Sequence, residues 1–227
     1  MFRAIAIKEL REIRGIAIGA LIVYATITIG AIDYRSPLNL FFIMDTSMSL
    51  ERVPFVRDNF VGKFCFFTAM VTMMLGFWQT FGESVRGTYP FLLHRPAGRT
   101  WLIGMKLFVG MVAYLILAAI PIGIYAIWAA TPGNHASPFE WSMTIPTWIG
   151  WFAMTMLYLG AFLTGIMPGR WYGARFLPLA ASAFLLFVLL QFVSNFGGMW
   201  WLCGVVLAVD LWLIALIFFV AKTRDYS

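Results

Sequence analysis

Asp210 is the ionisable residue that stands deepest inside an apolar stretch of this sequence, in the run VVLAVDLWLIA. A carboxylate at bilayer depth is costly unless it is protonated or paired, so Asp210 is a candidate intramembrane polar site, together with Gln191 near the end of the preceding apolar run. Two interpretations stay open. Asp210 contacts a proton or a substrate, or it is a structural residue that is hydrogen-bonded within the bundle. We favour the second, because one acid without another makes a poor proton relay.

The other residues with ligating or reactive side chains do not form a recognisable site. His94 and His135 are far apart and are predicted on opposite membrane faces, so they cannot share a metal. Cys65 and Cys203 lie in apolar segments without a CxxC or Cys/His pattern and are interpreted as apolar fillers. Both are predicted towards the outer side, so a disulfide stays open.

Sequence motifs for common catalytic sites are also missing. The chain has no G-x-x-x-x-G-K-[ST] loop, no H-E-x-x-H and no G-x-S-x-G. We therefore expect that it is not an enzyme, that it does not hydrolyse ATP alone, and that it holds no metal and no cofactor of its own.

Composition places the chain among polytopic membrane proteins. It has 227 residues, of which 62% are hydrophobic and 11% are charged, whereas a soluble domain is about 25% charged. Mean hydropathy is +0.86, and the 22 Phe and 10 Trp suit lipid-facing surfaces and interfacial belts. The net charge of +6 lies mostly in short loops, so it favours anionic lipid headgroups and not nucleic acid.

The apolar segments predict an all-α fold with six transmembrane helices in one transmembrane domain, residues 1–227. A span needs about 20 mainly apolar residues. Six segments meet this length approximately: 15–32, 64–81, 107–130, 147–167, 176–194 and 199–221.

Residues 1–14 have a different pattern from the first span. Apolar residues recur at helical spacing and charged residues fill most of the other positions, which predicts a short amphipathic helix on the membrane surface. The alternative is a solvated, frayed terminus. The Gly15 to Gly19 run is a small-xxx-small motif that allows close helix packing, including packing between two protomers.

The distribution of Lys and Arg predicts that both termini are cytoplasmic. Twelve of these residues fall in the two termini and in the loops after the second and fourth spans, whereas four fall in the first loop, 33–63. That first loop is long and external, and its role stays open. The third loop, 131–146, contains three prolines and is predicted to be irregular. The short NFGG link at 195–198 makes the last two spans an antiparallel hairpin.

The cytoplasmic loop 82–106, GESVRGTYPFLLHRPAGRTWLIGMK, carries the most specific pattern in the chain. A protein without an ATPase can use ATP through a partner that grips a rigid cytoplasmic element, and this loop has the composition of such an element. Its apolar residues suit a partner's groove, and its last basic residues, Arg95, Arg99 and Lys106, are expected at headgroup level or on the partner surface. An ordinary positive-inside loop is the alternative.

The order of residues in this loop resembles the type-2 ABC transporter permeases, the membrane subunits of exporters. That family has a K-E-L/F-x-E/R-type run before its first span, matched here by KELREIRG at 8–15. Its first cytoplasmic loop carries an E-x-x-x-G-T…L-L…P-x-x-R…K pattern. The matching residues are Glu83, Gly87, Thr88, Leu92, Leu93, Pro96, Arg99 and Lys106. The six-span layout is also similar, but NFGG leaves little room for the re-entrant helices that such permeases often carry before their last span.

The resemblance implies a half-transporter in a bacterial-type inner membrane. It pairs with a second permease copy or a related permease, and with separate ABC ATPase subunits that bind ATP and Mg²⁺. The coupling residues implied are Glu83, Arg86, Gly87, Thr88, Leu92, Leu93, Arg95, Pro96 and Arg99. The expected cargo is hydrophobic or amphipathic. The rival hypothesis is a non-transporting membrane protein, such as an assembly, immunity or anchor subunit.

Overall fold

The structure is a computed structural model that describes residues 2–32, 53–56, 58, 60–86, 98–135, 138–167, 172–196 and 200–223. Within these ranges the regular structure is entirely helical, as the sequence predicts. The helices are α1 (Phe2–Ile32), α2 (Phe60–Arg86), α4 (Arg99–Ala130), the short 3-10 helix η2 (Trp141–Thr144), α5 (Ile145–Ala153), α6 (Thr155–Ile166), α7 (Tyr172–Phe196) and α8 (Trp201–Thr223).

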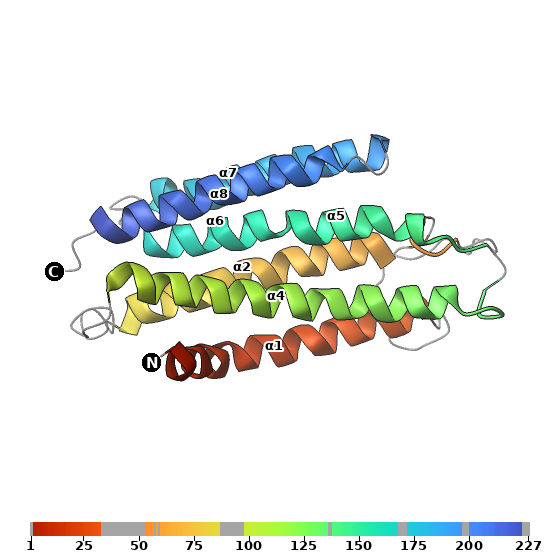
Figure 1. The fold of residues 1–227 in the computed structure, drawn as a ribbon, viewed down its shortest axis with the longest axis horizontal. Coiled ribbons are helices and arrows are strands. Elements are labelled where there is room, and N and C mark those ends of the chain that lie inside the picture. Colours follow the sequence, from red (N-terminus) through yellow and green to blue (C-terminus); the bar gives the residue numbers. More distant parts are fainter. Residues whose placement is uncertain are drawn as a thin grey trace.

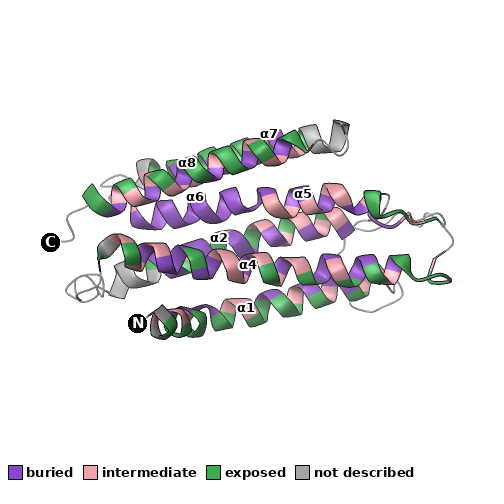
Figure 2. Cartoon of the chain, viewed as in Figure 1, coloured by how far each residue is buried: buried purple, intermediate pink, exposed green. Residues whose placement is uncertain are grey.

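The helices lie side by side in an elongated bundle, with α1 beginning and α8 ending at the same end (Figure 1). Helix α6 is the centre of the bundle, and every one of its residues is buried (Figure 2). It packs against α2, α7 and α8. Two glycines allow the close approach to α2: a Cβ at Gly76 would lie 2.7 Å from the Tyr158 carbonyl oxygen, and one at Gly165 would lie 1.8 Å from Thr80 Oγ1.

Five helical segments of the described chain are long and apolar enough to cross a membrane, which confirms a multi-pass membrane protein. They are Ile5–Ile32, Phe60–Phe81, Thr100–Ala130, Trp141–Ile166 and Trp201–Thr223. In α7 the apolar described stretch, Arg175–Gln191, is shorter than this limit. The span predicted at 176–194, and with it the total of six spans, therefore stays a prediction.

The N-terminal segment is not a separate element. The expected surface helix at 1–14 and the expected first span join in one continuous helix, α1. In Figure 1 the first turns of α1 are seen nearly end-on, whereas the rest lies in the plane of the view, so the helix bends along its length. The charged residues of the first turns therefore belong to the same continuous helix as the apolar span.

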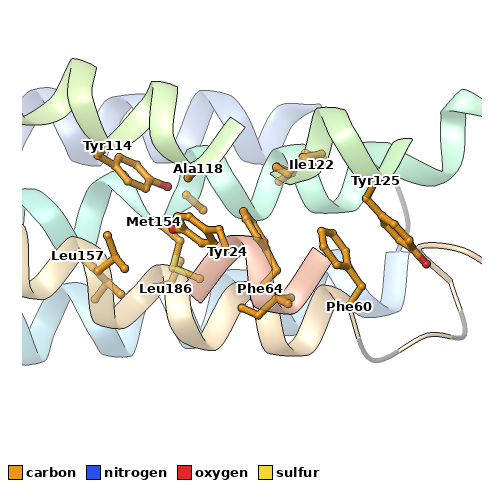
Figure 3. Packing of buried hydrophobic residues seen from close by; sticks show 14 of the residues in the cluster. Tyr24, Phe60, Phe64, Tyr114, Ala118, Ile122, Tyr125, Met154, Leu157 and Leu186 are labelled. Carbon is orange, nitrogen blue, oxygen red and sulfur yellow. The ribbon is translucent and has the colours of Figure 1, made fainter. Parts of the chain in front are cut away.

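The fourth predicted span is interrupted near its middle. A turn at Met154 separates α5 from α6, which otherwise follow the same direction (Figure 1). Met154 belongs to the larger core cluster, which also contains Tyr24, Tyr114 and Leu186 (Figure 3). The third loop is shorter than predicted, because η2 and α5 begin at Trp141 and Ile145, and Pro146 occupies the first turn of α5, where a proline needs no N–H partner.

Candidate functional site

Lys106 is the centre of a buried polar cluster near the end of the bundle where α1 begins. The residue is 6% exposed, and its Nζ lies 3.0 Å from Glu9 Oε2 and 3.8 Å from Glu12 Oε2. Nζ also donates a hydrogen bond to the Gln79 carbonyl oxygen, at 3.3 Å. Glu9 is itself only 1% exposed. The ammonium group and the carboxylate therefore form a buried ion pair between α4 and α1.

Gln79 extends this cluster from α2 to α6. Its Nε2 donates to the Lys106 carbonyl oxygen at 3.1 Å, and its Oε1 accepts from the Tyr158 hydroxyl at 2.7 Å. The Tyr158 hydroxyl also lies 3.1 Å from the Leu107 carbonyl oxygen. Gly110 leaves the space for these groups, since a Cβ there would lie 2.2 Å from Gln79 Oε1 and 2.3 Å from the Tyr158 hydroxyl oxygen. We call Glu9, Gln79, Lys106 and Tyr158 the polar junction.

The polar junction joins four helices, one residue from each of α1, α2, α4 and α6. Each of its side chains is bonded to a neighbour on another helix, which is how a buried charge becomes tolerable in an apolar surrounding. Chemically the arrangement holds helices in register. In the part of the chain that the structure describes, no group of three or more His, Cys, Asp or Glu side chains is placed to bind a metal ion.

The charges of α1 divide between two faces. Glu9 is turned inwards to Lys106, and Glu12 lies partly exposed beside Lys8, with Lys8 Nζ 3.4 Å from Glu12 Oε1. The outer face carries most of the basic residues of the first turns: Arg3, Lys8, Arg11 and Arg14 are exposed. The mixed sequence KELREIR therefore places an acid inside the bundle and leaves a mostly basic surface outside.

The structure places the predicted coupling residues only in part. Glu83 and Arg86 lie in the last turn of α2, and Arg99 begins α4. The other residues of that prediction lie outside the described residues: Gly87, Thr88, Leu92, Leu93, Arg95 and Pro96. The expectation for Lys106 was wrong, because α4 starts at Arg99 and carries Lys106 two turns into the helix, where Glu9 pairs with it.

The two predicted intramembrane polar residues differ in the structure. Asp210 is buried at 8% exposure, and its Oδ2 is within hydrogen-bond distance of Thr155 Oγ1 on α6. Gln191 is exposed on α7 in this chain. Apolar residues lie on all sides of α7, so the sequence did not indicate which side of this helix is buried.

The remaining candidates keep their open interpretations. Gly15 and Gly19 are exposed on α1, and a Cβ at either position would have nothing within 4 Å. They therefore mediate no close helix packing with the described part of this chain. Cys65 and Cys203 are both free thiols and are partly buried.

Three members of the polar junction were missed at the sequence level. Glu9 is one of several charges in a helical pattern, and only its place opposite Lys106 distinguishes it. Gln79 and Tyr158 left a fainter signal, since Gln79 is a lone amide in FWQTF and Tyr158 is a hydroxyl-bearing residue within an apolar span. A polar side chain inside a span usually has a partner, but the sequence does not identify that partner.

The polar junction is the candidate functional site, and it lies near the end of the bundle where α1 begins. It joins the N-terminal helix to the two helices on either side of residues 87–97. Comparisons of this chain with protein-family models, with curated proteins and with solved structures give no match.

Proposed function

We propose that this chain is the transmembrane subunit of an ATP-binding-cassette exporter. A separate nucleotide-binding subunit hydrolyses ATP, and the loop at 82–106 transmits its movement to the bundle. The observation that carries the proposal is the polar junction, which ties both ends of that loop to the N-terminal helix. The resemblance of the loop to the type-2 ABC permeases implies an ATPase as the kind of partner.

The hydrogen bonds of the polar junction link the helices through which a movement of the loop would pass. The Gln79 side chain bonds to the Lys106 backbone, and the Lys106 side chain bonds to the Gln79 backbone, so α2 and α4 are fastened reciprocally. Lys106 then carries the connection to Glu9 and Gln79 carries it to Tyr158. A displacement of the loop ends moves α1 and α6 with them, because packed helices shift as rigid bodies.

The proposal includes a topology of six crossings with both termini in the cytoplasm of a cell with a bacterial-type inner membrane. Its support is the excess of Lys and Arg at the termini and in the second and fourth loops, together with the start of α1 and the end of α8 at the same end of the bundle (Figure 1). In this topology helix α7 also crosses the membrane, which brings the number of crossings from five to six.

The proposed assembly contains a second permease subunit, identical or related, and two ATPase subunits that bind ATP and Mg²⁺. The cargo is hydrophobic or amphipathic, in keeping with spans whose exposed surfaces are rich in Ile, Phe, Trp and Leu. It passes between the two permease subunits.

The test is purification of the tagged chain from its native membrane in a mild detergent. We expect an ATP-hydrolysing subunit with a phosphate-binding loop in the same complex, identified by mass spectrometry, and ATP hydrolysis after reconstitution into liposomes. Material that contains no nucleotide-hydrolysing subunit would contradict the proposal and favour the non-transporting alternative.

Variants of the loop locate the contact. Glu83→Ala and the double change Leu92→Ala with Leu93→Ala are expected to release the ATPase or to lower its activity in the complex. Phe108→Ala is the matched control, because Phe108 is 55% exposed on α4 close to Lys106 and bonds to no polar group. Equal ATPase retention and activity in all three variants would show that the loop is not the contact.

A further inference from the structure

The interruption between α5 and α6 exposes backbone acceptors in the middle of a membrane span. In an uninterrupted helix the carbonyl groups of Trp151 and Phe152 would accept the N–H groups four residues later. Here the Trp151 carbonyl oxygen accepts a hydrogen bond from the Tyr114 hydroxyl, and the Phe152 carbonyl oxygen lies 2.7 Å from Thr155 Oγ1. Side-chain hydroxyl groups thus satisfy a backbone that lipid cannot satisfy.

Thr155 has two polar neighbours but only one proton to donate. Its Oγ1 lies within hydrogen-bond distance of the Phe152 carbonyl oxygen and of Asp210 Oδ2. A carbonyl oxygen cannot donate, so the hydroxyl proton belongs in the bond to Phe152. The bond to Asp210 then needs a proton from the carboxyl group, with Thr155 Oγ1 as the acceptor.

We propose that Asp210 is an intramembrane proton site, held as a neutral carboxylic acid whose O–H joins α8 to the break between α5 and α6. The chain of donors runs from Asp210 to Thr155 and from Thr155 to the Phe152 carbonyl oxygen. Each hydrogen in it has one acceptor. An ionised Asp210 would take the Thr155 proton and leave the Phe152 carbonyl oxygen without it.

The second oxygen of Asp210 supports the same assignment. Oδ1 is buried and has no hydrogen-bond partner among the described residues. In a neutral acid this atom is a carbonyl oxygen, for which the absence of a partner costs far less than for a charged carboxylate oxygen. Asp210 also forms no ion pair with any Lys or Arg side chain in the described ranges.

Among the residues that the structure describes, the surroundings of Asp210 offer no charge that would stabilise its ionised form. Helix α8 packs against α4, α5 and α6. Helix α5 has no ionisable residue, and Tyr158 is the one ionisable residue of α6. From α4, Tyr114 is near Asp210, and its hydroxyl proton is used by the Trp151 carbonyl oxygen. Lys106, the cation of α4 with a described side chain, is bonded to Glu9.

A proton at this position links the charge of Asp210 to the shape of the broken span. Removing it would place a negative charge at bilayer depth and draw the Thr155 proton away from the Phe152 carbonyl oxygen. The helix break at Met154 would then lose the arrangement that satisfies it. This inference stands independently of the exporter proposal, because it concerns a side chain on α8 and not the loop or its partner.

Infrared spectroscopy of the full chain in lipid bilayers at neutral pH tests the assignment. The C=O stretching band of a protonated carboxylic acid is separate from the carboxylate bands. Growth with carboxyl-labelled aspartate shifts the aspartic acid bands and not those of glutamic acid. We expect one labelled carboxylic acid band in the wild-type protein and its loss in Asp210→Asn, whose amide N–H still donates to Thr155.

Two further variants keep the test decisive if Asp210→Asn does not fold. Thr155→Val preserves the shape of the side chain and removes the hydroxyl, so the band should persist but shift in frequency. Asp58→Asn should leave an Asp210 band in place. A wild-type spectrum without a labelled carboxylic acid band would overturn the proposal, as would a band that survives in Asp210→Asn or keeps its frequency in Thr155→Val.

Discussion

The polar junction and the site around Asp58 lie near opposite ends of α4 and hold an ionisable group in different ways. Lys106 in the junction has Glu9, Glu12 and the Gln79 carbonyl oxygen around one ammonium group. Asp58 accepts a hydrogen bond from the Tyr125 hydroxyl through Oδ2, while its Oδ1 is buried without a hydrogen-bond partner in the described chain. Opposite charges compensate the Lys106 ammonium group, whereas Asp58 has hydrogen bonds but no ion pair among the described residues.

The neighbours of the two sites explain this difference. Asp58 lies beside an aromatic cluster in which the Phe55 ring packs 4.8 Å from the Tyr125 ring and 5.6 Å from the Phe60 ring, measured between centroids. Phe55 has a φ of 64°, a left-handed conformation that a bulky residue seldom adopts, so ring packing holds this turn. Burial raises the pKa of Asp58, and the bond from Tyr125 lowers it by a smaller amount.

The comparison predicts the largest effect for loss of one partner in the junction. Lys106→Met removes the ammonium group that lies 3.0 Å from the buried Glu9 carboxylate, which should cost about 3–5 kcal/mol of stability. Thermal unfolding of the detergent-solubilised protein measures it. The control is Lys222→Met at the exposed end of α8, expected to change stability by no more than about 0.5 kcal/mol.

A double substitution separates the value of the pair from the penalty of breaking it. Glu9→Leu with Lys106→Met replaces the two charges by apolar side chains, and most of the lost stability should return. If the double variant is as unstable as Lys106→Met, the loss comes from packing and not from the broken ion pair between Lys106 and Glu9, and the contrast with Asp58 fails.

The next effect concerns the space that the junction needs. A methyl group at Gly110 would collide with both the Gln79 side chain and the Tyr158 hydroxyl, so Gly110→Ala should cost about 1–3 kcal/mol. Gly123→Ala, on the same helix, meets nothing within 4 Å and should be neutral or slightly stabilising, since alanine favours a helix. Chemical unfolding of the two variants side by side gives the difference. Equal stability would show that the junction rearranges freely.

Much of the fold could be predicted from the sequence, whereas the junction could not. Long apolar runs predicted the membrane helices, because the bilayer requires a minimum length that composition alone reveals. The pairing of Glu9 with Lys106 depends on packing between helices that are distant in sequence. The end of a span is also set by partners: Lys106 was expected at a headgroup, but its pairing allows it to lie inside the bundle.

Asp210 shows the same limit in the middle of the bundle. Its isolation in an apolar run predicted a buried polar residue, and the structure confirms the burial. The sequence contains no sign that the span at 147–167 is interrupted, since Met154 is neither glycine nor proline. The partner Thr155 is therefore found only once the helices are placed in space.

At the Asp58 site, loss of the hydrogen bond from Tyr125 should have a moderate effect. Tyr125→Phe keeps the ring in its cluster and removes the donor to Asp58, so stability should fall by about 1 kcal/mol at neutral pH. The rings of Phe55 and Phe60, which pack against the ring at position 125, are unchanged, so the aromatic packing is preserved. A drop as large as that of Lys106→Met would mean that Asp58 is as strongly coupled as the junction, and would remove the distinction between the two ends.

The smallest effect has the opposite sign and depends on pH. Because burial raises the pKa of Asp58 in the folded state, the unfolded chain loses this proton at a lower pH than the folded protein does. Wild-type stability should therefore decline as pH rises from the ordinary aspartate pKa through the raised one, and then stay level. Asp58→Asn cannot ionise and still accepts from Tyr125, so it should be more stable than wild type at neutral pH and equal to it at pH values below the ordinary pKa. Melting temperatures of both proteins across this range measure the difference. Wild type that is the more stable at neutral pH would show that the carboxylate is compensated after all, as Lys106 is.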